Sequence, residues 1–217
     1  ARRSLLAATA EAQVAMERLS SGKKINSASD DPAGFAIAMR MTSQIRGLNT
    51  AAKNAGDGIS MLSAVEGAAS DVSDMLQRIR VLAVQSVSDT NSPKDREYLQ
   101  DEVRSLIAEI DRVADQTLYN GESLLDGSRS GSIQVGAQAG QTVGFNIKSI
   151  RASDLGESGF TAGQSLADID LSLNPSDALE IITGAIEQVA GDRAGYGALQ
   201  NRLDYTVSNL LNVVEFT

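Results

Sequence analysis

The stretch that decides the fold runs from Asp31 to Ser88 and reads DPAGFAIAMRMTSQIRGLNTAAKNAGDGISMLSAVEGAASDVSDMLQRIRVLAVQSVS. Apolar or small residues recur along it at alternating steps of three and four, namely Ala38, Met41, Ile45, Leu48, Ala52, Ala55, Ile59, Leu62, Val65, Ala69, Val72, Leu76, Ile79 and Ala83. This repeat is typical of a coiled-coil seam, with one phase slip after Leu62. It predicts a single helix of roughly 85 Å, longer than a compact domain of this size needs. We therefore expect it to lie against other long helices.

Two more long helices are predicted, each beginning at a proline. Ser92-Pro93 and Asn174-Pro175 repeat the arrangement of Asp31-Pro32, a capping residue followed by a proline in the first turn. The second seam is Leu99, Val103, Leu106, Ile110, Val113 and Thr117, and the third is Ile182, Ala185, Val189, Tyr196, Leu199, Leu203, Thr206, Leu210 and Val213. A short helix over residues 4–22 has the seam Leu5, Ala8, Ala12, Ala15 and Leu19, and Gly22 ends it.

Between the second and third long helices the period changes. Residues 132–135 and 142–147 alternate with period two around Gln138–Gln141, which predicts a β-hairpin. Asn120-Gly121 is a turn signal. Residues 151–173 are rich in Gly, Ser and Asp and weakly patterned, so we expect an exposed crossing loop there.

These elements predict a mainly α fold, an elongated antiparallel bundle of long coiled-coil-like helices with a small β-hairpin cap. The chain runs out, back and out again before the third long helix returns, so the N- and C-terminal segments are expected side by side. Within the third helix, Gly191, Gly195 and Gly197 suggest a close helix crossing or a soft spot, and Asp192 falls on the seam as a local defect.

The composition excludes several classes of function. The chain has no cysteine and no histidine, which removes thiolate metal sites, the commonest metal ligand and the commonest general base. A net charge of −9 argues against nucleic-acid partners, and no apolar run approaches the length of a membrane span. We expect no cofactor and no enzymatic activity.

Two short motifs have alternative interpretations. The pair Asp30-Asp31 suits a metal or acid–base site, but acids are also favoured at a helix N-terminus, which is the preferred interpretation. The glycines around Tyr196 resemble part of a phosphate-binding loop, yet no strand precedes them.

Several blocks, in the same order along the chain, resemble bacterial flagellin. They are ERLSSGKKINSASDDPAG at residues 17–34, NAGDGIS at 54–60, LQRIRVLAVQS at 76–86, EIDRV at 109–113 and GALQNRL at 197–203. The resemblance covers nearly the whole chain except residues 151–173. It implies a secreted, extracellular subunit that is exported unfolded and packs with copies of itself into a helical filament for swimming. By the same resemblance, an export chaperone and hook-associated proteins are partners.

The resemblance also implies a domain organisation. Residues 1–31 would form part of the inner-tube domain (D0) and its connector, which orders only on assembly. Residues 32–150 and 174–217 would form the rod domain (D1), and residues 151–173 stand where relatives insert outer domains. Family sequences begin before Ala1 and continue beyond Thr217, so this chain by itself is expected to assemble poorly.

Flagellins are also recognised by the innate-immune Toll-like receptor 5. The matching positions in this sequence are Gln77, Arg78, Leu82 and Glu102, with Gln85 nearby. Val81 departs from the family pattern, in which glutamate is common. From the residues alone, without the resemblance, Arg78 and Glu102 are interpreted as ordinary solvent-exposed residues on the outer faces of their helices.

Three alternatives to a filament subunit remain. A hook–filament junction protein would share the helical architecture without polymerising. An adhesin or carbohydrate-binding module would use residues 120–173, although aromatic residues for sugar stacking are sparse there. An enzyme is the most remote alternative.

Overall fold

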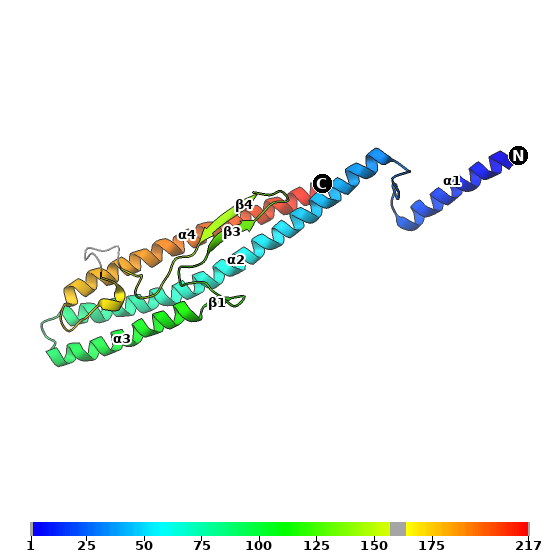
Figure 1. Cartoon of the computed structure of the whole chain (residues 1–217). Coiled ribbons are helices and arrows are strands. Elements are labelled where there is room, and N and C mark those ends of the chain that lie inside the picture. The colour runs from blue at the N-terminus through cyan, green and yellow to red at the C-terminus, as the bar shows by residue number, and fades with distance from the viewer. Residues whose placement is uncertain (1, 157–163, 217) are drawn as a thin grey trace.

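The computed structural model describes residues 2–156 and 164–216, and it is a long rod (Figure 1). The helices are α1 (Arg2–Ser21), α2 (Pro32–Val87), α3 (Pro93–Gln116) and α4 (Pro175–Phe216), with a 3-10 turn η1 (Leu166–Asp168). The strands are β1 (Leu118–Tyr119), β2 (Glu122–Ser123), β3 (Ser130–Gln134) and β4 (Thr142–Asn146). The predicted mainly α, elongated antiparallel bundle is confirmed.

The deciding stretch forms one uninterrupted helix of 56 residues, α2. Its N-terminus is capped as predicted, because the Asp31 carboxylate accepts a hydrogen bond from the Gly34 N–H at 3.0 Å. The other two predicted helix starts are also confirmed, since Pro93 and Pro175 open α3 and α4. At α3, the Ser92 hydroxyl accepts from the Asp95 N–H while the Asp95 carboxylate accepts from the Ser92 N–H, a reciprocal capping box.

The predicted seam of α2 is buried from Leu48 to Ala83, with Ala52 and Ile59 only partly covered. The phase slip is accommodated, because Leu62 and Val65 are both fully buried. Before Leu48 the seam is wrong as a buried stripe within this chain. Ala38 and Met41 are exposed, since the end of α4 lies beside α2 near Leu48 and leaves the first turns of α2 uncovered (Figure 1).

The two chain ends differ in their surroundings. The end of α4 lies beside α2, where Leu210 packs with Leu48 and Ala51. Helix α1 instead points away from the bundle, so the predicted contact between terminal segments does not include it (Figure 1). Its seam residues Ala8, Ala12, Ala15 and Leu19 are exposed, while the side chain of Leu5 lies outside the described part of the chain.

The predicted hairpin is confirmed as β3 and β4, paired antiparallel with Ile133 opposite Val143. It lies along the flank of α2 and α4 and does not cover an end of the rod (Figure 1). A Cβ added to Gly58 of α2 would lie 2.4 Å from Ile133, so the hairpin and the helix approach closely there. The Asn120-Gly121 turn is also confirmed, with positive φ at both residues between β1 and β2.

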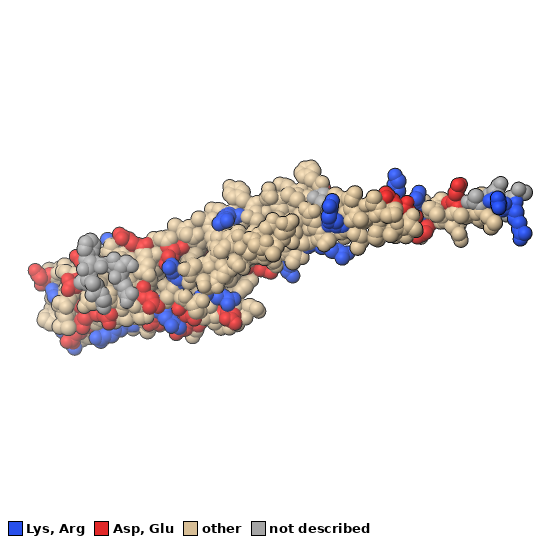
Figure 2. Space-filling model, turned by 45° about the horizontal axis from the view of Figure 1, so that its top comes forward, with Lys and Arg blue, Asp and Glu red and all other residues tan. Residues whose placement is uncertain are grey.

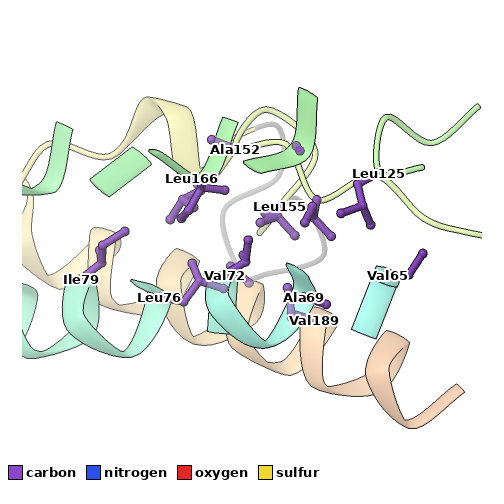
Figure 3. Close-up of a cluster of buried hydrophobic side chains, with 14 of the residues drawn as sticks. Val65, Ala69, Val72, Leu76, Ile79, Leu125, Ala152, Leu155, Leu166 and Val189 are labelled. Carbon is purple, nitrogen blue, oxygen red and sulfur yellow. The ribbon is translucent and has the colours of Figure 1, made fainter. Parts of the chain in front are cut away.

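The described part of residues 151–173 is the main correction to the predicted fold, because it contributes buried side chains to the core. This part, residues 151–156 and 164–173, is named the strap here. Figure 3 shows Ala152, Leu155 and Leu166 of the strap lying over Val72 and Leu76 of α2. All three are fully buried, and Leu171 is as well. The sequence does not predict this burial, because the few apolar residues of the strap have neither helical nor strand period and form no seam. Residues 157–163 of the predicted loop lie outside the described residues.

The glycines of α4 do not mark a close helix crossing. A Cβ added to Gly191, Gly195 or Gly197 would meet nothing within 4 Å. The interpretation as a soft spot stays a prediction. Asp192 does lie partly buried, as its seam position indicated, and burial raises the pKa of its carboxyl, with Lys148 acting in the opposite direction.

Two leucines of the strap test whether this segment is core. Leu155 is 0% exposed and Leu173 is 75% exposed. We expect Leu155→Ala to lower the free energy of unfolding by about 2–5 kcal/mol, because it removes a buried side chain and leaves a cavity. Leu173→Ala is the matched control and should change it by less than about 0.5 kcal/mol. Urea denaturation followed by circular dichroism measures both, and equal effects would contradict the buried strap.

Candidate functional site

The candidate surface lies where α2 and α3 run side by side. Arg78 of α2 reaches Glu102 of α3, and its Nε and terminal nitrogen donate to the same carboxylate oxygen at 2.8 and 2.6 Å. Both side chains stay about half exposed, at 54% and 43%. An exposed ion pair of this kind stabilises a fold by only about 0.2–1 kcal/mol. Its charged groups therefore remain available to a partner.

The other three residues predicted from the sequence differ in their exposure to solvent. Gln77 and Gln85 are exposed on α2, Gln85 being seven residues after Arg78 and hence on the same face. Leu82 is 1% exposed and belongs to the core cluster. The surface assignment of Leu82 is therefore wrong for the folded rod, because a partner cannot reach it without unfolding α2 locally.

Exposed apolar side chains outside the predicted set of contact residues lie beside the Arg78–Glu102 pair. Val81 and Val84 are both 56% exposed, and Val81 follows Arg78 by three residues and Gln77 by four. On α3, Tyr98 precedes Glu102 by one helical turn and lies with its ring 5.3 Å from the Lys94 ammonium. All three stand outside the predicted seams, and an apolar residue off the seam is the signal that would have found them.

Charged side chains gather on the part of the rod that carries α3. Figure 2 shows Asp and Glu interleaved with Lys and Arg there, whereas the middle of the rod on this face is mostly uncharged. Local pairs hold many of them, such as Arg112 with Glu109 and Arg151 with Asp115. The hydrogen bonds from Arg112 hold the pKa of Glu109 below its ordinary value.

Nothing in the described residues indicates catalytic chemistry. Within residues 2–156 and 164–216, acidic side chains do not cluster in a way that could hold a metal ion. The pair Asp30-Asp31 serves local structure. Asp31 caps α2, and the Asp30 carboxylate accepts from the Asn26 and Ser27 N–H groups at 3.0 and 2.9 Å, which lowers its pKa. None of the described helices is apolar over enough of its length to cross a membrane.

The opposite part of the rod presents apolar side chains that this chain leaves uncovered. On the first turns of α2 and the last turns of α4 they are Ile37, Met39, Met41, Tyr205, Leu211 and Phe216. On α1, Leu6, Met16 and Leu19 are exposed as well. Long helices that expose apolar residues along their sides favour contacts with further helices.

Comparisons with known proteins show which proteins this chain resembles. The family model for the bacterial flagellin N-terminal helical region matches residues 1–130. The chain is 40% identical to a flagellin of Halalkalibacterium halodurans over 94% of this chain and 74% of that protein. It is 46% identical to a flagellin of Shigella flexneri over 84% of this chain, but it spans only 33% of that relative's length.

Solved structures give the same fold. The crystal structure of Bacillus cereus flagellin superposes with a TM-score of 0.59 at 28% identity, covering 73% of this chain and 88% of that one. A provisionally assigned flagellar hook-associated protein from Vibrio parahaemolyticus reaches a TM-score of 0.75 over 88% of this chain and 96% of that one. At 18% identity, the second likeness concerns the fold alone.

The burial of Leu82 predicts how its replacement acts. We expect Leu82→Ala to lower the free energy of unfolding by about 2–5 kcal/mol, as for other buried leucines. Its neighbour Val81 is exposed, so Val81→Ala is the control and should shift stability by less than about 0.5 kcal/mol. Both values come from chemical denaturation. A neutral Leu82→Ala would mean that Leu82 is a surface residue after all.

Proposed function

Because the chain belongs to the bacterial flagellin family, a family of structural filament subunits and not of enzymes, we propose that it builds the extracellular filament that drives swimming. The observation that carries this proposal is the rod itself. Its long helices bury one seam within the chain and leave further apolar side chains exposed on α1, α2 and α4. Covering such surfaces by neighbouring copies contributes roughly 25 cal/mol per Å² of apolar area.

The domain organisation belongs to the same proposal. Residues 32–150 and 174–217 act as the rod domain, supported by the packing of α2 with α3 and α4. Residues 1–31 act as part of the inner tube, supported by the position of α1 away from the bundle (Figure 1). Residues 151–173 stand in the place where relatives insert outer domains. Other copies of the chain, an export chaperone and hook-associated proteins are the partners that family membership supports.

Electron microscopy tests the filament. We expect the chain, expressed together with the terminal segments that flagellin sequences have before Ala1 and beyond Thr217, to form long helical filaments after salt-induced assembly. The same protein should restore swimming in a host that lacks its own flagellin. A hook–filament junction protein is the alternative candidate, because such a protein would share the helical architecture without polymerising. That protein class would give no elongating filament in the same experiment, so the two outcomes separate the candidates.

We further propose that the flank of α2 and α3 is a contact surface for Toll-like receptor 5. The support is the exposed Arg78–Glu102 pair with Gln77 and Gln85 beside it. Leu82 takes no direct part, because it is buried.

A receptor reporter assay tests this surface. We expect Arg78→Ala combined with Glu102→Ala to lower potency at least about tenfold, because charged hydrogen-bonded groups at an interface contribute more than 1.4 kcal/mol. The matched control is Arg193→Ala with Glu66→Ala, which removes another interhelical pair, between α4 and α2, at the same 2.6 Å. Unchanged potency of the first double variant, or an equal loss in the control, would reject the assignment.

A further inference from the structure

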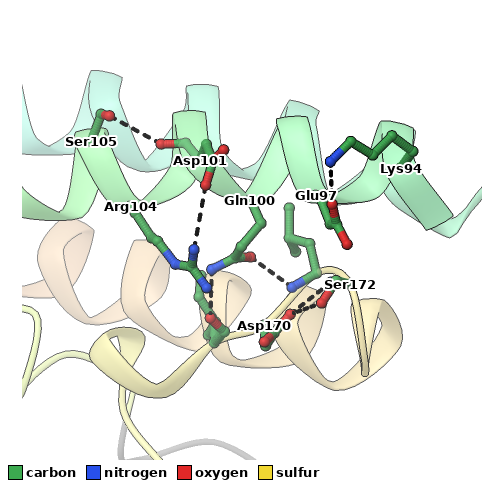
Figure 4. A network of polar contacts seen from close by, with 10 residues as sticks. Lys94, Glu97, Gln100, Asp101, Arg104, Ser105, Asp170 and Ser172 are labelled. Carbon is green, nitrogen blue, oxygen red and sulfur yellow. Dashed lines mark hydrogen bonds and ion pairs between the residues drawn. The ribbon is translucent and has the colours of Figure 1, made fainter.

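Gln100 is a buried polar side chain on α3, only 4% exposed. Its amide nitrogen donates to the Ile169 carbonyl at 3.1 Å, and its amide oxygen accepts from the Leu171 N–H at 2.7 Å. Figure 4 shows Gln100 reaching from α3 to the chain segment that carries Asp170. One side-chain amide thus satisfies the two backbone groups that a neighbouring β-strand would otherwise bind.

Gln188 of α4 makes the same arrangement at the other end of the strap. Its amide nitrogen donates to the Asp154 carbonyl at 3.1 Å, and its oxygen accepts from the Gly156 N–H at 3.2 Å. The strap also lies close to α4, since a Cβ on Gly156 would come within 2.8 Å of Ile181. The strap is therefore fastened to α3 by one glutamine and to α4 by another.

Two more polar contacts fasten the strap to α3. The Asp111 carboxylate accepts from the Ala152 N–H at 2.8 Å, and Asp115 pairs with Arg151 at 2.7 Å. Gln100, Asp111 and Asp115 are separated by eleven and four residues, which places them on one face of the helix. Two residues further on from Gln100, Glu102 is turned by about 200° toward α2. Helix α3 is therefore held between the strap and α2.

We infer that Gln100 is a positioning residue. The hydrogen bonds of Gln100 to the strap fix the position of α3 on α2. That position places Glu102 opposite Arg78. The fully buried strap residues Leu155 and Leu166 anchor the strap to the core. Because Gln100 binds this anchored strap, it keeps α3, and with it Glu102, in a fixed position relative to Arg78. The receptor consequence rests on the proposed function above, whereas the positioning does not.

The first test is amide hydrogen exchange measured by NMR. Gln100→Met keeps the length of the side chain and removes both hydrogen bonds. We expect it to accelerate exchange of the Leu171 N–H about tenfold or more and to leave the Gly156 N–H unchanged. Gln188→Met should do the reverse. A role in general stability alone would speed both amides together in either variant, and that result would overturn the inference.

The second test follows the ion pair itself. The Arg78 Nε–H donates to Glu102, so its exchange with water reports whether the pair is formed. In Gln100→Met we expect this exchange to accelerate several-fold, at least about threefold. The Arg193 Nε–H, which donates to Glu66 at 3.0 Å, is the internal control and should not change. An unchanged Arg78 signal would overturn the positioning role.

Receptor potency then separates this inference from the proposed function. If the receptor contacts this surface, Gln100→Met should lower potency about as much as Glu102→Ala does. If the Arg78 signal responds to Gln100→Met while Arg78→Ala with Glu102→Ala leaves potency unchanged, the positioning role stands and the receptor assignment falls.

Discussion

The apolar face of α2 is the constraint on which the rest of the structure depends. One helix of 56 residues offers a buried stripe from Leu48 to Ala83, and α3, α4, the hairpin and the strap each cover part of it. Helix α4 covers it over most of its length, and the hairpin covers its flank near Gly58. Farther along α2, both α3 and the strap pack over its apolar stripe (Figure 3). Burial along a single stripe explains why the molecule is a rod with no globular centre.

Irregular chain can lie in this core only if its backbone groups find partners. Part of the strap backbone is paired within the strap, since the Leu166 N–H donates to the Leu155 carbonyl and the Ala167 N–H donates to the Ala152 carbonyl. Side chains of α3 and α4 bind other backbone groups of the strap. Gln100 and Gln188 each bind a carbonyl and an N–H of the strap, and Asp111 binds another N–H. An unpaired buried amide costs about 1–3 kcal/mol, so these contacts decide whether the strap can stay buried. They also connect α3 to α4 without direct packing of one helix on the other.

Because a single chain buries only part of its apolar helix faces, apolar surface remains exposed for contacts with other subunits. One chain covers one side of α2. The first turns of α2, one face of the last turns of α4 and the described part of α1 remain exposed. In an enzyme such exposure would be a liability. In a flagellin, this exposed apolar surface can be buried against the same helices of neighbouring copies when subunits assemble.

The sequence by itself determined the long helices, their starts and most of their buried faces. Coiled-coil period and proline placement act locally and persist over many turns, so Pro32, Pro93 and Pro175 could be assigned without coordinates. From the resemblance, Arg78 and Glu102 are predicted to share a surface, and the structure places them in contact across α2 and α3. Only the tertiary structure decided which residues of that flank are accessible. Leu82 stands next to an exposed valine in the motif, but whether its face meets the core depends on helices distant in sequence.

Only the tertiary structure decided the strap as well. Ala152, Leu155, Leu166 and Leu171 are too few and too irregularly spaced to form a seam, and they are buried because α2, α3 and α4 leave a groove that they fill. Gln100 reads in the sequence as an ordinary polar helix residue. Its role depends on the backbone of residues 169–171, about 70 positions away, and no local pattern records a contact made across that separation.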